Sequence, residues 1–283
     1  MLLTPELITL VLFAALLHAT WNALVKQGGD RLLILAAVNG CGMLVGALGV
    51  PLLQPPAPAS WIYLLLSIVL HFGYYYFLLQ AYRFGDLSHV YPLARGAAPL
   101  LVLLGGLWAA GETLPGGAVV GVLLASAGII SLAFDRGLPW WRDPRPVLYA
   151  LGTSLFIAAY TVVDGLGVRA SGSPAGYIFW LFFLDGWPLL LFALARRRRQ
   201  LWTFLAREWR IGLGGGLAAI TGYGLVIYAM SRGAMAAVSA LRETSVIMAV
   251  LIGTWLLGER FGARRMAAAC LVTLGVGLMN VLH

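Results

Sequence analysis

Hydrophobic residues fill most of this chain in long runs, and short polar or basic segments separate the runs. A helix needs roughly 20 apolar residues to cross the hydrocarbon core of a bilayer, so each run is long enough for one crossing. The expected spans cover residues 5–26, 32–53, 60–81, 88–110, 116–134, 147–168, 175–195, 211–231, 234–257 and 264–282. The pattern predicts an all-α polytopic membrane protein with ten transmembrane helices.

The pattern of the first half of the chain recurs in the second half. A shift of 147 residues pairs the following positions: Arg95 with Arg242, Trp108 with Trp255, Gly111 and Glu112 with Gly258 and Glu259, and Gly128 with Gly275. Each half holds five expected spans, and because five is odd the second half must enter the membrane in the opposite direction. We expect two inverted five-helix repeats, residues 1–134 and 147–283, joined by a linker at residues 135–146.

Composition excludes an ordinary soluble domain, since 61% of the residues are hydrophobic and only 11% are charged. The net charge is +8, but its distribution is more informative than its sum. Fifteen lysines and arginines fall in the odd-numbered loops, whereas the even-numbered loops hold only Arg169 and Arg232. The positive-inside rule then places both termini outside the cytoplasm. We expect a multi-pass protein of the cell inner membrane, with the lipid bilayer as partner and no nucleic-acid partner.

Residues 200–210 alternate apolar and basic side chains at helical spacing. This pattern is typical of a short helix that lies on the inner leaflet, and a solvated loop is the alternative. The motifs Gly42-x-x-x-Gly46 and Gly117-x-x-x-Gly121 predict places where helices approach closely.

Ionisable and polar groups inside a bilayer are costly, so those that persist usually face a cavity or a partner. His71, Tyr75 and Tyr82 share one face of the third span at positions i, i+4 and i+11. Tyr75 also aligns with Tyr223 of the eighth span at a shift of 148. These side chains predict a cavity wall that binds a substrate, and the alternative is that they only bond neighbouring helices.

Arg95 and Arg242 lie at equivalent positions inside the fourth and ninth spans. A guanidinium donates two parallel hydrogen bonds to a carboxylate, as an amino-acid or organic-acid site requires. The alternative is an internal ion pair with Glu243, Asp164 or Asp185. The candidate substrate-binding or cavity residues are His18, Trp21, Asn22, His71, Tyr75, Tyr82, Tyr91, Arg95, Tyr160, Asp164, Tyr223, Arg242 and Glu243.

The sequence lacks the motifs of the common membrane-embedded enzymes and pumps. It contains no HExxH, no GxSxG, no Walker sequence and no cluster among its four histidines and two cysteines. We therefore expect no enzyme activity, no cofactor and no metal, and rank a membrane enzyme, a scaffold or a channel low. Asp164 and His71 are the protonatable groups to watch if transport is proton-coupled. Facilitated diffusion is equally allowed.

The ten spans, the Gly111-Glu112 and Gly258-Glu259 pairs, Trp21-Asn22 and Lys26 together resemble the drug/metabolite transporter superfamily. Within it the chain is similar to the EamA-like exporters, including bacterial exporters of aromatic amino acids. The resemblance implies two inverted five-helix repeats around a central cavity, alternating access, and export of small metabolites, chiefly amino acids. Many relatives have cytoplasmic termini, the reverse of what the charge count predicts here.

The superfamily also contains exchangers of anionic metabolites such as nucleotide sugars or phosphate esters. That alternative calls for more lysines and arginines in the cavity than the two found inside the spans. The expected partner is thus a small-molecule substrate, and a monomer is allowed.

Overall fold

The computed structural model describes residues 3–27, 30–85, 87–134, 143–248 and 263–281, and the regular structure in these residues is helical. The α-helices are α1 (Pro5–Gln27), α2 (Arg31–Gly49), α3 (Trp61–Phe84), α4 (Leu87–Ala110), α5 (Gly116–Leu132), α6 (Arg145–Ala170), α7 (Pro174–Met230), α8 (Met235–Arg242) and α10 (Ala263–Val281). Within the described chain six helices are long and apolar enough to cross a membrane. The helical multi-pass character is confirmed, and the division into ten inverted spans remains a prediction.

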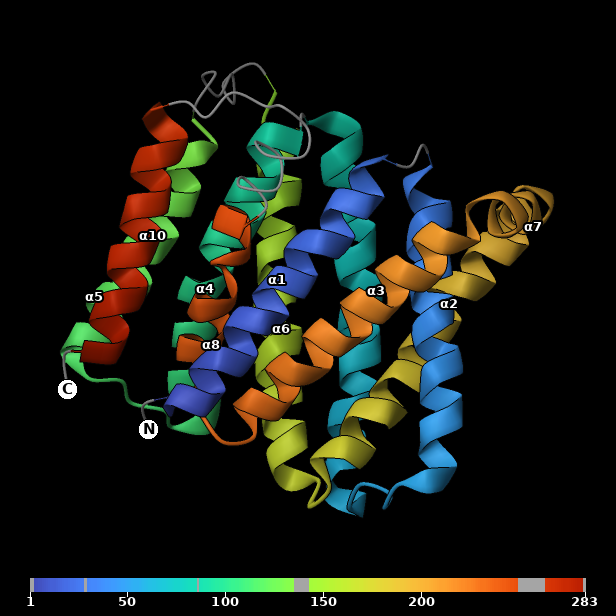
Figure 1. Ribbon diagram of the computed structural model, residues 1–283, viewed down its shortest axis with the longest axis horizontal. Coiled ribbons are helices and arrows are strands. Elements are labelled where there is room, and N and C mark those ends of the chain that lie inside the picture. The colour runs from blue at the N-terminus through green and yellow to red at the C-terminus, as the bar shows by residue number, and fades with distance from the viewer. Residues whose placement is uncertain (1–2, 28–29, 86, 135–142, 249–262, 282–283) are drawn as a thin grey trace.

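Helix α7 covers both spans expected at residues 175–195 and 211–231, together with the segment between them. It extends over 57 residues, with non-helical backbone at two points. A straight helix of this length would extend about 85 Å, nearly three times the hydrocarbon thickness, so it has to bend. It bends at Arg197 (φ −144°, ψ 40°) and Glu208 (φ −114°, ψ 25°), and the stretch between them turns aside, seen almost end-on beside the α7 label in Figure 1. The helix predicted at residues 200–210 is therefore present, as the middle of α7.

The expected span at residues 234–257 is also interrupted. Helix α8 ends at Arg242, Glu243 and Thr244 form a turn, and helix resumes at residues 245–248. The turn is tight because the backbone N–H groups of Glu243 and Thr244 donate to carbonyls three residues back. The break leaves Glu243 fully buried at the end of a helix. Residues 249–262 lie outside the described part of the chain, so the predictions for Trp255, Gly258 and Glu259 are not compared.

The linker expected at residues 135–146 ends before residue 146, because helix α6 already begins within it. Helix α6 begins at Arg145, because Pro146 is accommodated in the first turn, where its missing N–H is not needed. Residues 135–142 of this linker lie outside the described residues.

Close helix packing holds the bundle together (Figure 1): α2 lies along α7, α3 along α6, and α5 along α10. Glycine permits two of these contacts. A Cβ on Gly46 would lie 2.8 Å from the carbonyl oxygen of Phe179 in α7. A Cβ on Gly121 would collide with the carbonyl oxygen of Gly275 in α10. The close approaches predicted from the glycine spacing are confirmed at Gly46 and Gly121.

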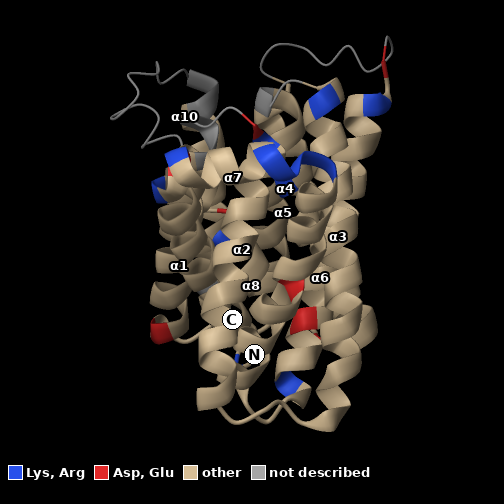
Figure 2. Ribbon diagram, turned by 90° about the vertical axis from the view of Figure 1, so that its right-hand side faces the viewer, with Lys and Arg blue, Asp and Glu red and all other residues tan. Residues whose placement is uncertain are grey.

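Basic residues gather toward one end of the bundle, and both chain termini lie nearer the other end (Figures 1 and 2). This is the separation on which the positive-inside argument depends. The orientation of the termini across the membrane itself remains a prediction.

Candidate substrate cavity

A cavity of about 120 Å³ lies inside the bundle, with walls from α1, α2, α3, α4, α6, α7 and α8. Both halves of the sequence contribute to it. Its polar and aromatic lining residues include His18, Trp21, Asn39, His71, Tyr74, Tyr75, Arg95, Tyr160, Phe182, Asp185, Tyr223 and Arg242.

Eight of the residues predicted from the sequence line this cavity. They are His18, Trp21, His71, Tyr75, Arg95, Tyr160, Tyr223 and Arg242. Five others do not line it: Asn22, Tyr82, Tyr91, Asp164 and Glu243.

The reasons for these exclusions are local. The Asn22 amide donates to the carbonyl oxygen of His18 within its own helix at 2.7 Å. Tyr82 lies a full two turns beyond the cavity residues of α3 and carries the Arg31 guanidinium over its ring at 4.5 Å. Tyr91 is partly buried on α4, one turn before Arg95.

Arg95 is occupied by an internal ion pair. Its Nε–H donates to Glu243 Oε2 at 2.9 Å, and its Nη2 lies 2.9 Å from Glu243 Oε1, close enough for an ion pair although that contact lacks hydrogen-bond geometry. Both side chains are almost completely buried. For Arg95, therefore, the ion-pair alternative describes the structure. The pair joins α4 of the first half to the turn that follows α8 in the second half.

Arg242 is much less well neutralised. Its Nε lies 3.9 Å from Glu243 Oε1, the carboxylate that already serves Arg95, and its guanidinium carbon lies 6.0 Å from the centre of the Tyr223 ring. Nε and Nη2 are buried without a hydrogen-bond partner among the described residues. A buried cation with unmade hydrogen bonds is costly, so this position favours an anionic group in the cavity.

His18 presents a second unpaired donor. The indole N–H of Trp21 donates to His18 Nδ1 at 3.1 Å. An imidazole that accepts at Nδ1 carries its hydrogen on Nε2. That Nε2 is buried and has no partner among the described residues. The cavity therefore offers hydrogen-bond donors from α1 and α8.

Asp185 places an acceptor on a different wall. The Tyr75 hydroxyl lies 2.8 Å from Asn39 Oδ1 and 3.3 Å from Asp185 Oδ2. One hydroxyl hydrogen cannot satisfy both acceptors, so the Asp185 carboxylate keeps free capacity for a donor. From the sequence, Asp185 is expected only as an ion-pair partner, and Asn39 is not among the candidate residues. Both are polar residues inside apolar runs, the signal that identified the other candidates.

An aromatic cluster completes the lining. The His71 ring stacks on Tyr160 with centroids 4.1 Å apart, and Tyr223 meets Tyr160 edge-on at 5.8 Å. The edge of Tyr160 also faces Tyr74, at 5.7 Å. Such faces bind apolar rings by stacking and cations through their π-electrons.

Asp164 lies behind this cluster and is fully buried. It accepts hydrogen bonds from the hydroxyls of Tyr177 at 3.1 Å and Tyr223 at 2.5 Å. It has no arginine partner in the described structure, so the ion-pair alternative does not apply to it. Its contact with Tyr223 orients a ring of the cavity wall.

Glu112 connects helices at the end of the bundle nearer the termini. Gly111 adopts φ +63°, a conformation that glycine tolerates, and the chain turns there after α4. The Glu112 carboxylate accepts the Met235 N–H at 2.9 Å, at the start of α8, and the Arg169 Nη2–H at 2.5 Å. Arg169 also donates to the Gly233 carbonyl at 2.7 Å. The network gives Glu112 a structural role, whereas its counterpart Glu259 is outside the described residues.

Comparison with known proteins agrees with this architecture. Residues 144–281 match the model of the EamA-like transporter family. A solved crystal structure resembles the whole chain, with 21% sequence identity, 99% of each chain covered and a TM-score of 0.79, a likeness that shows the fold alone. The comparison with curated proteins found no match. The second half of this chain is thus similar to an EamA-like transporter domain, which supports membership of the drug/metabolite transporter superfamily without showing it for the whole chain.

Proposed function

We propose that this protein is a secondary transporter that exports small zwitterionic metabolites, amino acids including aromatic ones, through the central cavity. The observation that carries the proposal is the distribution of unpaired polar atoms. Arg242 and His18 offer donors for a carboxylate, and Asp185 offers an acceptor for an ammonium group. The two ends of an α-amino acid require this combination.

The aromatic cluster supports substrates with a planar or apolar side chain. Tyr74, Tyr160, Tyr223 and the stacked His71 surround the polar groups with ring faces and edges. Aromatic pairs in these geometries contribute about 0.5–1.5 kcal/mol beyond the area they bury. A tryptophan, phenylalanine or tyrosine side chain would gain this contribution, and a short polar side chain would not.

The size of the cavity favours a small substrate over a nucleotide sugar. A volume of about 120 Å³ has room for roughly ten water molecules at about 10–15 Å³ for each. Ten waters have about as many heavy atoms as one amino acid. A nucleotide sugar is several times larger, and a dianionic phosphate would face one incompletely paired arginine and the nearby Asp185 carboxylate.

The ion pair between the halves suits alternating access. Arg95 and Glu243 join α4 to the broken helix beyond α8. A rocking motion of one half against the other would therefore act directly on this contact. In many secondary transporters the binding site lies where a helix is interrupted between two repeats. The turn at Glu243 and Thr244 provides such an interruption beside the cavity residue Arg242.

The experiment that tests the proposal is uptake by proteoliposomes that contain the purified protein. A labelled panel of Trp, Phe, Tyr, Thr and Met is compared with nucleotide sugars, with and without imposed pH and voltage gradients. We expect saturable amino-acid flux that protein-free liposomes lack. Exchange of nucleotide sugars without amino-acid flux would refute the substrate class, and dependence on a gradient would direct attention to Asp164 and His71.

A further inference from the structure

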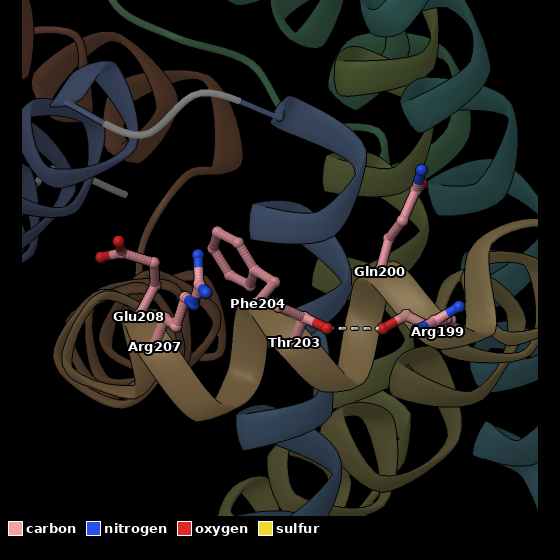
Figure 3. A pocket seen from close by; sticks show the side chains of 6 residues that line it. All are labelled: Arg199, Gln200, Thr203, Phe204, Arg207 and Glu208. Atoms are coloured by element: carbon pink, nitrogen blue, oxygen red, sulfur yellow. Dashed lines mark hydrogen bonds between the residues drawn. The ribbon is translucent and has the colours of Figure 1, made fainter.

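The middle segment of α7, between the bends at Arg197 and Glu208, carries a groove that the transport proposal does not use. The groove has a volume of about 410 Å³ and is open to the outside. Its lining residues are Arg199, Gln200, Thr203, Phe204, Arg207 and Glu208. Figure 3 shows Gln200, Phe204, Arg207 and Glu208 projecting to the same side of the segment. Arg199 lies at the end of the groove opposite Glu208.

The position of the segment fixes its surroundings. The parts of α7 before and after it are each about 20 residues long, the length of one membrane crossing. The segment that joins them must therefore lie at the membrane surface. Trp202, on the segment, and Trp209, just after its second bend, are 58% and 53% exposed. Exposed tryptophans are typical of anchors at the level of the lipid headgroups.

Packing against α2 holds the segment in place. Leu201 is fully buried in a cluster with Leu33 and Ala36 of α2, and Phe204 packs at the edge of the same cluster. Arg197 forms an ion pair with Asp30, the residue that caps the start of α2. The groove is consequently a fixed surface of the bundle, and its residues keep their relative positions.

The positive charges of the groove have no ion-pair partner among the residues that the structure describes. Arg199 and Arg207 form no ion pair in the described residues, whereas Arg197 is paired, Arg196 lies over the Phe192 ring and Arg210 lies over the Trp209 ring. Glu208 is the single acidic residue of the groove. The Arg207 guanidinium and the Gln200 amide lie on opposite sides of the Phe204 ring (Figure 3), and two such donors suit a phosphodiester whose glycerol part rests on the ring.

We propose that this groove is a binding site for one anionic phospholipid of the leaflet that it faces. The Arg207 guanidinium and the Gln200 amide bind the phosphodiester, Phe204 contacts the glycerol and the first methylenes, and Arg199 adds positive charge at the rim. Glu208 accepts a hydrogen bond from a headgroup hydroxyl, which favours phosphatidylglycerol. The site is independent of the substrate cavity, because none of its residues lines that cavity.

Native mass spectrometry of the full-length protein in detergent tests the site, with phosphatidylglycerol, phosphatidylcholine and inorganic phosphate titrated separately. We expect saturable binding of one phosphatidylglycerol, with at least tenfold weaker phosphatidylcholine binding. Removing a surface arginine weakens anionic lipid binding about fivefold, and Arg207→Ala should exceed this because it also loses the hydrogen bonds. Arg198→Ala is the matched control, since it removes one exposed charge from the same segment outside the groove.

The other outcomes overturn the proposal. Equal weakening by Arg198→Ala and Arg207→Ala would indicate a diffuse basic surface without a site. Inorganic phosphate that competes at equal affinity would show an anion site that does not recognise lipid. Size-exclusion chromatography establishes that each variant is folded, and Gln200→Leu, which keeps all the charges, should still weaken binding if the groove recognises the headgroup.

Discussion

Arg95 and Arg242 occupy the same position in the two halves of the sequence, yet their surroundings differ. Arg95 is held by the Glu243 carboxylate through two contacts of 2.9 Å. Arg242 lies 3.9 Å from the same carboxylate, and two of its nitrogen atoms have no hydrogen-bond partner in the described part of the chain. The residue after each arginine explains the difference. Gly96 follows Arg95, and Glu243 follows Arg242.

Gly96 and Glu243 lie in different surroundings, and each is suited to its own. A Cβ on Gly96 would lie 2.9 Å from the Ile130 backbone nitrogen and 3.1 Å from the Ser126 carbonyl oxygen, so α5 leaves no space for a side chain there. Glu243 lies in the turn after α8, where the helix is broken and a carboxylate can reach across to α4. One half thus supplies the carboxylate that neutralises the arginine of the other half. Two arginines at matching positions in the two halves of the sequence therefore differ in how well their charge is neutralised.

Removal of the shared carboxylate is expected to have the largest effect, because it leaves both arginines unpaired. Glu243→Gln should reduce stability by about 3–5 kcal/mol, the usual consequence of leaving a buried charge without its partner. The measurement is chemical or thermal unfolding in detergent. The double variant Arg95→Met with Glu243→Met should recover much of the loss. Equal instability of the single and double variants would contradict the pairing.

Loss of the less neutralised arginine should act on transport more than on folding. A hydrogen bond to a charged group contributes about 1.5–3 kcal/mol, so Arg242→Ala should lower the initial rate of amino-acid uptake about 10- to 150-fold at limiting substrate. The protein should remain monodisperse. The same variant should affect the corresponding decarboxylated amine much less. Unchanged amino-acid uptake by a folded variant would remove Arg242 from the site.

Asp185→Asn tests the opposite end of the proposed substrate. The amide keeps the size of the side chain and a partner for Tyr75, but it loses the charge that attracts an ammonium group. We expect about fivefold weaker apparent affinity for amino acids, from roughly 1 kcal/mol of lost interaction, and little change for carboxylic acids without an amine. Competition of both classes against labelled phenylalanine measures the difference, and an equal loss for both classes would indicate a structural role.

We expect the smallest effect on stability from an exposed ion pair. Its comparison with the buried pair tests how far burial determines the strength of such a contact. Arg145 contacts Asp143 at 2.9 Å just before α6, with both side chains exposed. The hydrogen bonds from Arg145 hold the pKa of the Asp143 carboxyl below its usual range. The pair is therefore present at neutral pH and is lost only as the pH falls through that lowered pKa. Asp143→Asn should leave the Tm unchanged at pH 7, because solvent screens exposed pairs.

Local sequence patterns predicted the helices well where one apolar run corresponds to one helix. The expected span at residues 5–26 corresponds to α1 (Pro5–Gln27), and the span at 88–110 to α4 (Leu87–Ala110). The helix expected at residues 200–210, between two spans, is present as the middle of α7 between the bends at Arg197 and Glu208. Arginine, glutamine and alanine are strong helix formers, so a basic segment can stay helical while it leaves the hydrocarbon.

The fold brings some, but not all, of the predicted site residues together around the cavity. Hydrophobic periodicity identified His71, Tyr75 and Tyr160 as inward residues, and all three line the cavity. It could not separate a cavity residue from one behind the wall, as for Asp164, since both are polar residues in apolar runs. It also passed over Asp185 as a lining residue, because its role depends on the approach of α3 to α7.

The sequence by itself determined that the chain is helical, that it crosses a membrane several times, and that an arginine recurs in both halves. These properties depend on apolar run length and local periodicity, which act within one helix. Only the tertiary structure decided which arginine is neutralised and which leaves donors unpaired in a cavity. That choice depends on a contact between residues 148 positions apart, and the packing of α4 against α5 and the broken helix beyond α8 sets its geometry.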